Sequence, residues 1–184
     1  MINIASSVYN LEHKALEVYV SGCTRHCMGC HNRELWEFDK GYDILEWLKI
    51  KDEFFKKDQM IKQFWILGGD LLCQKSLSES AYFLKSLSEY GKTIWLWTGA
   101  DMKEVLDFLR QYKLTCVKYV KTGQFIRTDS SIVYHPDKRE DTASVELASW
   151  NQILYRKDDD ADYVFTMLPF SFKSGNADGL EKDG

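Results

Sequence analysis

The sequence is poor in proline, in long apolar runs and in any excess of basic charge. Two prolines occur among 184 residues, and 24 Lys and Arg residues face 28 Asp and Glu residues, a formal net charge of −4. A chain without a basic excess has no electrostatic footprint for nucleic acid, and no run approaches the ~20 apolar residues of a membrane span. The first residues lack the basic start and apolar core of a signal peptide. We therefore expect a cytoplasmic protein that binds neither nucleic acid nor membranes.

Cysteine occurs in an odd number, five residues. In a chain without an export signal, this argues against a disulfide framework and for a reducing compartment. The composition is otherwise that of a globular protein, 45% hydrophobic and 14% aromatic. At this length one domain is expected. We assign it to residues 1–170 and expect residues 171–184 to form a flexible, solvated tail.

Strand and helix patterns alternate along the chain. Apolar, aromatic and β-branched stretches predict strands over residues 16–20, 64–67, 93–97, 114–120 and 130–134. An Asp or Ser followed three residues later by Glu is typical of a helix N-terminus. This pattern predicts helices that begin after Asp43, Ser76 and Asp101. This alternation predicts right-handed βαβ units, a parallel sheet and therefore an α/β fold.

Four loops follow the first four predicted strands. They are residues 21–32, Gly68-Gly69-Asp70, Trp97-Thr98-Gly99 and Lys121-Thr122-Gly123. The carboxyl ends of parallel strands meet at one edge of a sheet, so these loops are expected to build one site; the last of them fits a simple turn equally well. A complete eight-fold βα barrel needs ~250 residues, so this chain has room for a partial, open barrel. Such a site stays exposed unless a second macromolecule closes it.

The segment SGCTRHCMGCHN, residues 21–32, carries the most specific signal. Its cysteines, Cys23, Cys27 and Cys30, have the spacing C-x3-C-x2-C, and thiolates suit zinc, copper(I) and iron–sulfur clusters. Structural zinc usually takes two separated pairs of ligands, and the chain has no second cysteine pair. A histidine (His13, His26 or His31) could still complete a Cys3His zinc site.

The other interpretation is a [4Fe–4S] cluster held by three cysteines where four are usual. One iron then lacks a protein ligand and can bind a small chelating molecule. Arg25, Arg33 and the nearby histidines are expected to offset the thiolate charge. Cys73 and Cys116 are expected to be small core residues.

These motifs resemble a known family. A C-x3-C-x2-C loop after one strand and GGD after the next are similar to the radical S-adenosylmethionine (radical SAM) enzymes. More narrowly, SGCTRHCMGCHNRELWEF, KTIWLWTGADMKEVL, VKTGQFI and NQILY resemble segments of the activating proteins of anaerobic (class III) ribonucleotide reductase. The resemblance covers residues 16–155, with Leu71 standing where the family usually has a proline after GGD.

The resemblance implies a partial, open βα barrel of radical SAM type that binds a [4Fe–4S] cluster and S-adenosylmethionine. By position, Cys23, Cys27 and Cys30 would hold the cluster. The implied cofactor-binding residues are His31 and Asn32 beside the adenine, Gly68, Gly69 and Asp70 at the methionine amino group, and Trp97, Thr98 and Gly99 near the ribose and methionine. No catalytic side chain is implied.

The implied activity is reductive cleavage of S-adenosylmethionine to a 5′-deoxyadenosyl radical, which takes hydrogen from a glycine of the reductase. The implied partners are the large subunit of anaerobic ribonucleotide reductase, as protein substrate, and flavodoxin or ferredoxin, as electron donor. Two alternatives stay open: a radical SAM enzyme acting elsewhere, such as the activase of a pyruvate formate-lyase-like enzyme, and a non-catalytic Cys3His zinc-binding interaction module.

Overall fold

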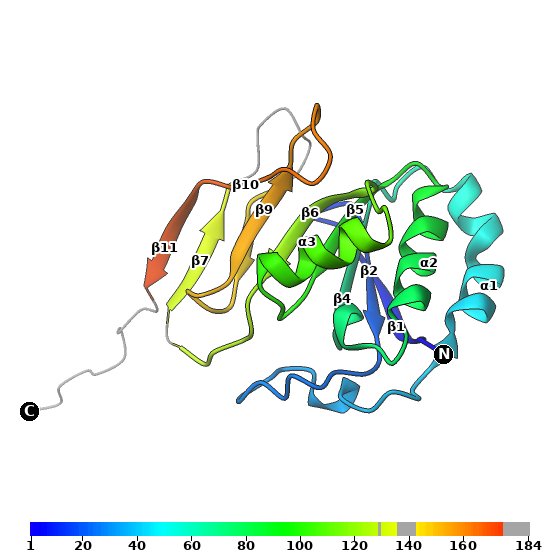
Figure 1. Ribbon diagram of the computed structural model, residues 1–184, viewed down its shortest axis with the longest axis horizontal. Helices are drawn as coiled ribbons and strands as arrows, with labels where there is room; N and C mark the ends of the chain where they lie inside the picture. The colour runs from blue at the N-terminus through cyan, green and yellow to red at the C-terminus, as the bar shows by residue number, and fades with distance from the viewer. Residues whose placement is uncertain (129, 136–142, 175–184) are drawn as a thin grey trace, which may run out of the picture.

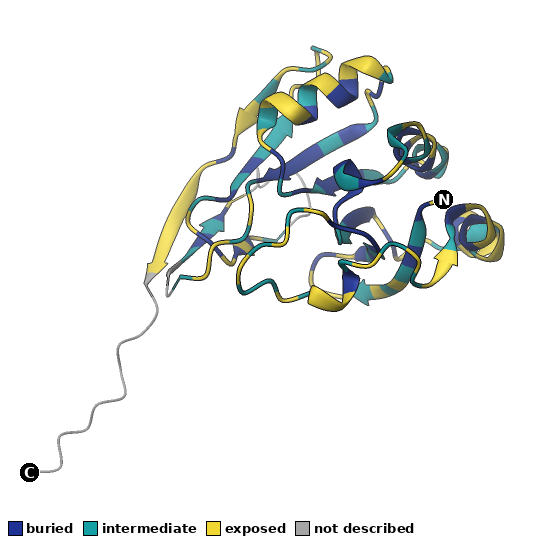
Figure 2. Cartoon of the chain, turned by 60° about the horizontal axis from the view of Figure 1, so that its bottom comes forward, coloured by how far each residue is buried: buried dark blue, intermediate teal, exposed yellow. Residues whose placement is uncertain are grey.

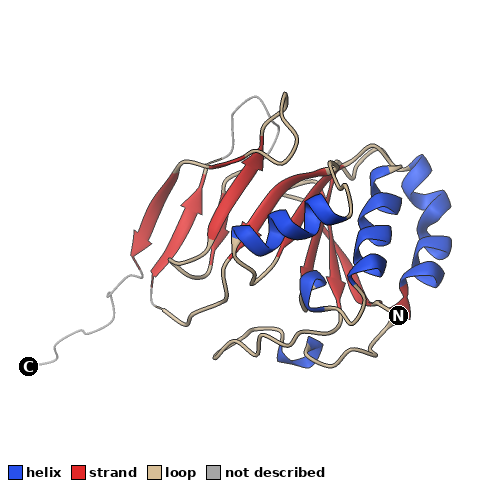
Figure 3. Cartoon of the chain, in the orientation of Figure 1, coloured by secondary structure: helices blue, strands red, loops and turns tan. Residues whose placement is uncertain are grey.

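The computed structural model describes residues 1–128, 130–135 and 143–174. An eight-stranded sheet in the order β10-β9-β6-β5-β4-β2-β1-β3 forms its centre, and a three-stranded sheet, β11-β7-β8, accompanies it (Figure 1). The strands are β1 (Asn3–Asn10), β2 (Ala15–Val20), β3 (Tyr42–Asp43), β4 (Gln63–Gly68), β5 (Thr93–Trp97), β6 (Val117–Thr122), β7 (Ser130–Tyr134), β8 (Val145–Leu147), β9 (Ile153–Lys157), β10 (Phe165–Met167) and β11 (Phe170–Ser174). The helices are α1 (Ile44–Lys57), α2 (Leu77–Ser88) and α3 (Met102–Gln111), with short 3₁₀ helices η1 (Arg33–Leu35) and η2 (Leu71–Cys73) (Figure 3).

The middle of the large sheet is parallel, as the strand–helix alternation predicts. Strands β2, β4, β5 and β6 lie side by side in that order, and each pairs in parallel with the next. Strand β1 is antiparallel to β2 on one side, and β9 is antiparallel to β6 on the other. The sheet is therefore mixed rather than wholly parallel, and β10 and β3 lie at its two ends.

The three helices begin at the residues that the capping patterns mark. The Asp43 carboxylate accepts hydrogen bonds from the amides of Leu45 and Glu46 at 2.9 and 3.0 Å. The Ser76 side chain accepts one hydrogen bond from the amide of Glu79 in α2, and the Asp101 side chain accepts one from the amide of Glu104 in α3. Because these bonds satisfy amides that have no partner inside the helix, they fix where each helix starts.

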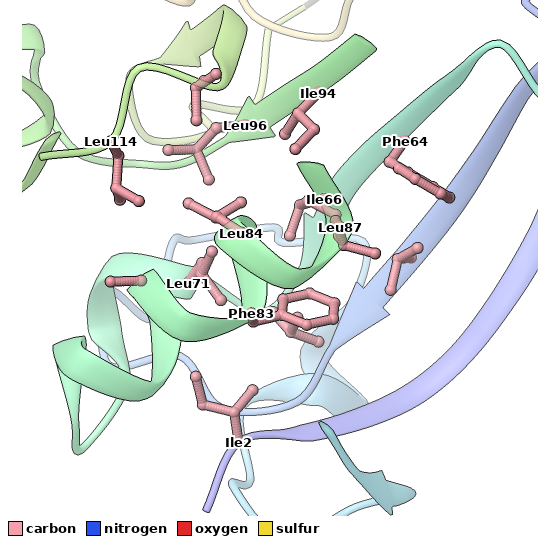
Figure 4. Close-up of a cluster of buried hydrophobic side chains, with 14 of the residues drawn as sticks. Ile2, Phe64, Ile66, Leu71, Phe83, Leu84, Leu87, Ile94, Leu96 and Leu114 are labelled. Carbon is pink, nitrogen blue, oxygen red and sulfur yellow. The ribbon is translucent and has the colours of Figure 1, made fainter. Parts of the chain in front are cut away.

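Two cores form because alternate residues of the central strands point to opposite faces. Phe64 and Ile66 of β4 pack against the helices, together with Leu84 and Leu87 of α2 (Figure 4). Trp65, between them in sequence, belongs to a second core that the small sheet completes. The central strands are accordingly buried, while exposed residues gather on the outer sides of the helices and on the peripheral strands (Figure 2).

Three details differ from the sequence-based expectations. The patterns do not predict β1, the first strand of the chain. The strand expected over 114–120 begins only at Val117, because the Leu114 amide bonds the Leu109 carbonyl at the end of α3. Residues 171–174, assigned to the tail, belong to β11, which pairs with β7; residues 175–184 lie outside the described residues. No helix of the described chain is long and apolar enough to cross a membrane.

Candidate functional site

A cavity of about 420 Å³ opens at the carboxyl ends of the parallel strands. The loops that follow β2, β4, β5 and β6 all contribute to its wall, as the topology predicts. Every predicted metal-binding or cofactor-binding residue except Cys30 lines it: Cys23, Cys27, His31, Asn32, Gly68, Gly69, Asp70, Trp97, Thr98 and Gly99. The structure therefore brings together residues that are spread over more than a third of the sequence.

The cysteine loop is fastened to the fold at its first residues. The amides of Gly22 and Cys23 donate to the carbonyls of Leu35 and Trp36 at 2.8 and 3.1 Å, and the Cys30 amide closes a turn onto the Cys27 carbonyl at 3.1 Å. Gly22 has a φ of +95°, and a Cβ there would clash with the Phe38 ring. Only glycine allows this turn at the point where β2 enters the loop.

The three thiols lie in one loop but are not gathered around one point. Among the residues that the structure describes, no three His, Cys, Asp or Glu side chains are placed to hold a metal ion. The Cys23 thiol instead forms a hydrogen bond with Cys73, the last residue of η2; this bond and burial raise the pKa of Cys23. Cys73 is thus half-buried beside a predicted ligand rather than in the core. Binding a cluster requires the loop side chains to turn toward a common centre.

The GGD turn and the cysteine loop touch through their backbones. The Gly69 amide donates to the Val20 carbonyl at 2.8 Å, and the Asp70 amide donates to the Gly22 carbonyl at 2.9 Å. A Cβ on Gly69 would clash with the Gly22 carbonyl oxygen. The paired glycines therefore permit a contact that any larger residue would prevent.

Arg25 forms ion pairs that the sequence did not predict. Its guanidinium Nε lies 2.5 Å from the Asp70 carboxylate, and its Nη2 lies 2.8 Å from Glu104 of α3. Asp70 also accepts hydrogen bonds from the Thr98 hydroxyl and the Gly99 amide. The arginine consequently pairs with two carboxylates in addition to lying near the thiols.

Lys121, at the end of β6, is a buried cation in the cavity wall. Its Nζ donates to the carbonyls of Thr98 and Gly123 at 3.4 and 3.1 Å. Burial lowers the pKa of Lys121 to about 8, partly opposed by the negative charge of Asp70. Lys121 and Gly123 line the cavity, whereas Thr122 faces the Ile153 carbonyl of β9. The Lys-Thr-Gly segment is thus part of the site.

Sequence reasoning missed other parts of the wall. Trp65, within the strand predicted over residues 64–67, lines the cavity beside Trp97, with ring centroids 5.2 Å apart. The indole Nε1 of Trp97 is buried without a hydrogen-bond partner in the described chain. The Phe125 ring packs 4.8 Å from His31. Residues 146–148, in and after β8, also reach the wall from a region where the sequence pattern was weak.

The comparisons with known proteins agree on a family. A family model described as a 4Fe-4S single cluster domain matches residues 14–135. An anaerobic ribonucleoside-triphosphate reductase-activating protein of Pasteurella multocida is 29% identical over 156 residues, which cover 82% of this chain and 92% of the relative. The protein of the same name from Haemophilus influenzae is 30% identical over 158 residues, with 82% and 93% covered. The chain belongs to the family of anaerobic ribonucleoside-triphosphate reductase-activating proteins. No solved structure matches it at a significant level.

The site of this activating-protein family member has the chemistry that an iron–sulfur cluster needs. Three thiols lie within one eight-residue stretch, and thiolates are the usual ligands of such clusters. Cys27 and Cys30 are half-exposed, so a cluster can reach them. The adjoining cavity falls within the ~300–1,000 Å³ of small-molecule sites. The unpartnered Trp97 indole and the Lys121 ammonium both offer donors to a polar ligand there.

Proposed function

We propose that this chain is a radical SAM activase that installs a glycyl radical on an anaerobic ribonucleotide reductase. One observation carries the proposal: a three-cysteine loop opens onto a cavity whose wall comes from the ends of all four parallel strands. Membership of the activating-protein family and the match to a 4Fe-4S single cluster domain support it.

In this proposal Cys23, Cys27 and Cys30 hold a [4Fe–4S] cluster and leave one iron open to S-adenosylmethionine. A bound cluster would supply the electron for the reductive cleavage of S-adenosylmethionine to methionine and a 5′-deoxyadenosyl radical, the species that would take hydrogen from a glycine of the partner. The chain's own residues would position the cofactor, because the loops with Gly68, Gly69 and Asp70 and with Trp97, Thr98 and Gly99 line the cavity together with the cysteine loop. His31 and Asn32 line the cavity next to the cluster loop, where the adenine is expected.

The architecture of the proposal is a partial, open βα barrel of radical SAM type. Support comes from the four adjacent parallel strands with helices on one face. The cavity opens at the carboxyl ends of the strands, where a docked reductase subunit would close it. Excluding water at that moment protects a reactive intermediate.

The proposed partners follow from this chemistry. The protein substrate is the large subunit of anaerobic ribonucleotide reductase, the class of enzyme that the relatives' names say they activate. The cluster needs a donor at the reducing end of the roughly −700 to +450 mV range of iron–sulfur centres, which flavodoxin or ferredoxin supplies. The five cysteines are free, in keeping with the reducing cytoplasm where such donors work.

Anaerobic reconstitution tests the proposal directly. The protein should bind iron and sulfide as a [4Fe–4S] cluster and release 5′-deoxyadenosine from S-adenosylmethionine when reduced. Cys27→Ala should lose both properties, while Cys116→Ala, which alters a half-buried thiol distant in sequence from the loop, should keep them. Zinc in place of iron, with no 5′-deoxyadenosine formed, would leave the zinc-binding interaction module as the better interpretation.

The partner needs a separate measurement. The reconstituted protein should produce a glycyl radical signal on the anaerobic ribonucleotide reductase subunit and none on a pyruvate formate-lyase-like enzyme. The reverse result would keep the radical chemistry and reassign the partner.

A further inference from the structure

The Asp70 carboxylate is the point at which three of the strand-end loops meet. It accepts hydrogen bonds from the Leu72 amide in its own loop at 2.9 Å, and from the Thr98 hydroxyl and the Gly99 amide of the β5 loop at 2.8 and 2.9 Å. The cysteine loop supplies the remaining donor, Arg25 Nε, at 2.5 Å. A carboxylate has about four acceptor positions. Asp70 is therefore fully used by the protein, and its side chain is only 2% exposed.

Arg25 connects this buried carboxylate to the molecular surface. Its side chain is 14% exposed and reaches Glu104 of α3, which is 48% exposed, through Nη2. Between its two partners it passes over Gly99, where a Cβ would lie 2.5 Å from Arg25 Cδ. The glycine of the Trp-Thr-Gly turn thus leaves the space through which the arginine crosses.

Few other contacts hold the middle of the cysteine loop. Among the described backbone hydrogen bonds of residues 21–32, those that tie the loop to the rest of the fold lie at its two ends, at Ser21, Gly22 and Cys23 and at Asn32, and the bond between Cys30 and Cys27 is internal. Beyond these, Thr24 contacts the Cys73 thiol, the His26 ring packs 4.6 Å from the Trp36 ring, and the His31 ring packs 4.8 Å from the Phe125 ring. The ion pair of Arg25 is the strongest link that joins the stretch between the first two cysteines to the sheet edge.

We propose that Arg25 is a positioning residue that clamps the cysteine loop to Asp70 and so sets the placement of Cys23 and Cys27 for the cluster. The inference rests on the proposed function, because it assumes that these cysteines bind iron. Arg25 lies midway between the two cysteines, so a guanidinium fixed at both ends limits how far either thiol can move. Residues that orient metal ligands in this way typically change metal affinity 10- to 100-fold when they are replaced.

The test compares cluster retention in four proteins reconstituted under anaerobic conditions: wild type, Arg25→Gln, Arg25→Lys and Lys103→Gln. The last is a matched control, because Lys103 forms an exposed ion pair with Asp107 on the same helix as Glu104. We measure the rate of iron release to an Fe²⁺ chelator and the electron paramagnetic resonance spectrum of the reduced cluster. Arg25→Gln should release iron about tenfold faster and broaden the spectrum. Arg25→Lys should restore part of the lifetime, because one ammonium can pair with Asp70 but cannot also hold Glu104.

The outcomes separate this inference from the proposed function. A wild-type protein that binds no iron–sulfur cluster overturns the proposed function. A wild-type protein that binds the cluster, with Arg25→Gln matching its release rate and spectrum, overturns the clamp alone. If the Arg25→Gln apoprotein fails to fold, Arg25→Lys decides: release at the wild-type rate refutes the clamp, and an intermediate rate supports it. A Lys103→Gln effect equal to that of Arg25→Gln also refutes it, since the effect would then come from charge in general.

Discussion

Replacing Lys121 by methionine should stabilise the apoprotein at pH 7. Methionine has a similar length and no charge, and Lys121 is 8% exposed in the cavity wall. Burial lowers the pKa of Lys121 from 10.5 to about 8. The folded protein therefore holds the charged form at a cost that the unfolded chain does not bear.

The size of the effect follows from these values. A difference of about 2.5 pKa units corresponds to about 3 kcal/mol at 1.36 kcal/mol per unit. Against this, the variant loses the hydrogen bonds to the carbonyls of Thr98 and Gly123, each worth about 1 kcal/mol. The net expectation is a free energy of unfolding about 1 kcal/mol higher for the variant at pH 7.

The pH dependence gives the sharper test. Between about pH 8 and pH 10.5 the unfolded chain keeps the Lys121 proton while the folded protein releases it, so wild-type stability gains from rising pH. Methionine does not titrate, and the other ionisable groups are the same in both proteins. The variant should therefore change from about 1 kcal/mol more stable than wild type at pH 7 to about 1 kcal/mol less stable at pH 9.5, a shift of about 2 kcal/mol. Urea unfolding of both apoproteins at several pH values measures this, and an unchanged gap would refute a buried, charged Lys121.

Four further substitutions test the packing of the fold and the assignment of the cysteines. Gly69→Ala should destabilise the apoprotein by about 1–3 kcal/mol in thermal unfolding, because its Cβ would clash with the Gly22 carbonyl oxygen. Gly91→Ala meets open space and should cost only the strain of its positive φ, about 1 kcal/mol, so equal losses would contradict the clash. Leu84→Ala removes a fully buried side chain of the helix-side core and should cost about 2–5 kcal/mol of unfolding free energy in urea; a loss below 1 kcal/mol would contradict that burial. Cys116→Ala should cost about 1 kcal/mol and leave iron content unchanged, and a loss of iron would make this thiol a ligand.

The parallel centre of the fold is readable from the sequence because it obeys simple rules. Residues 93–97, TIWLW, form β5 over the predicted range. A short run of aromatic and β-branched residues between a helix that ends near a glycine and a Thr-Gly turn is typical of a buried strand. The helix starts at Asp43 and Asp101 were equally accessible, because capping depends on a local hydrogen bond. Parallel strands bring the loops at their carboxyl ends to one edge of the sheet, so the loops that form the site could be predicted from the strand order alone.

What the sequence did not reveal depends on long-range contacts. Strand β1 carries an irregular register between Ile4 and Ser6, which breaks the alternation that marks a half-buried strand. Lys121 is buried, although lysine usually lies at the surface, so its residue type alone predicts the wrong environment. His13, which the sequence offers as a possible zinc ligand, is buried with its ring 4.6 Å from that of Trp65. The ion pair between Arg25 and Asp70 could not be predicted from the sequence either, because the two residues are far apart in the chain and only the folded structure brings them together.

The wall contributed by residues 146–148 has a consequence for how this protein is made. The cysteines are translated early, but the strand that completes their cavity belongs to a small sheet whose outer strand, β11, comes from the last part of the described chain. On the ribosome, the nascent chain therefore presents its thiols well before the cavity beside them has all of its wall. Iron delivered during synthesis would meet an incomplete site, whereas iron delivered after release meets the assembled one. Maturation of this protein is thus expected to be post-translational, with the cluster as the last part added.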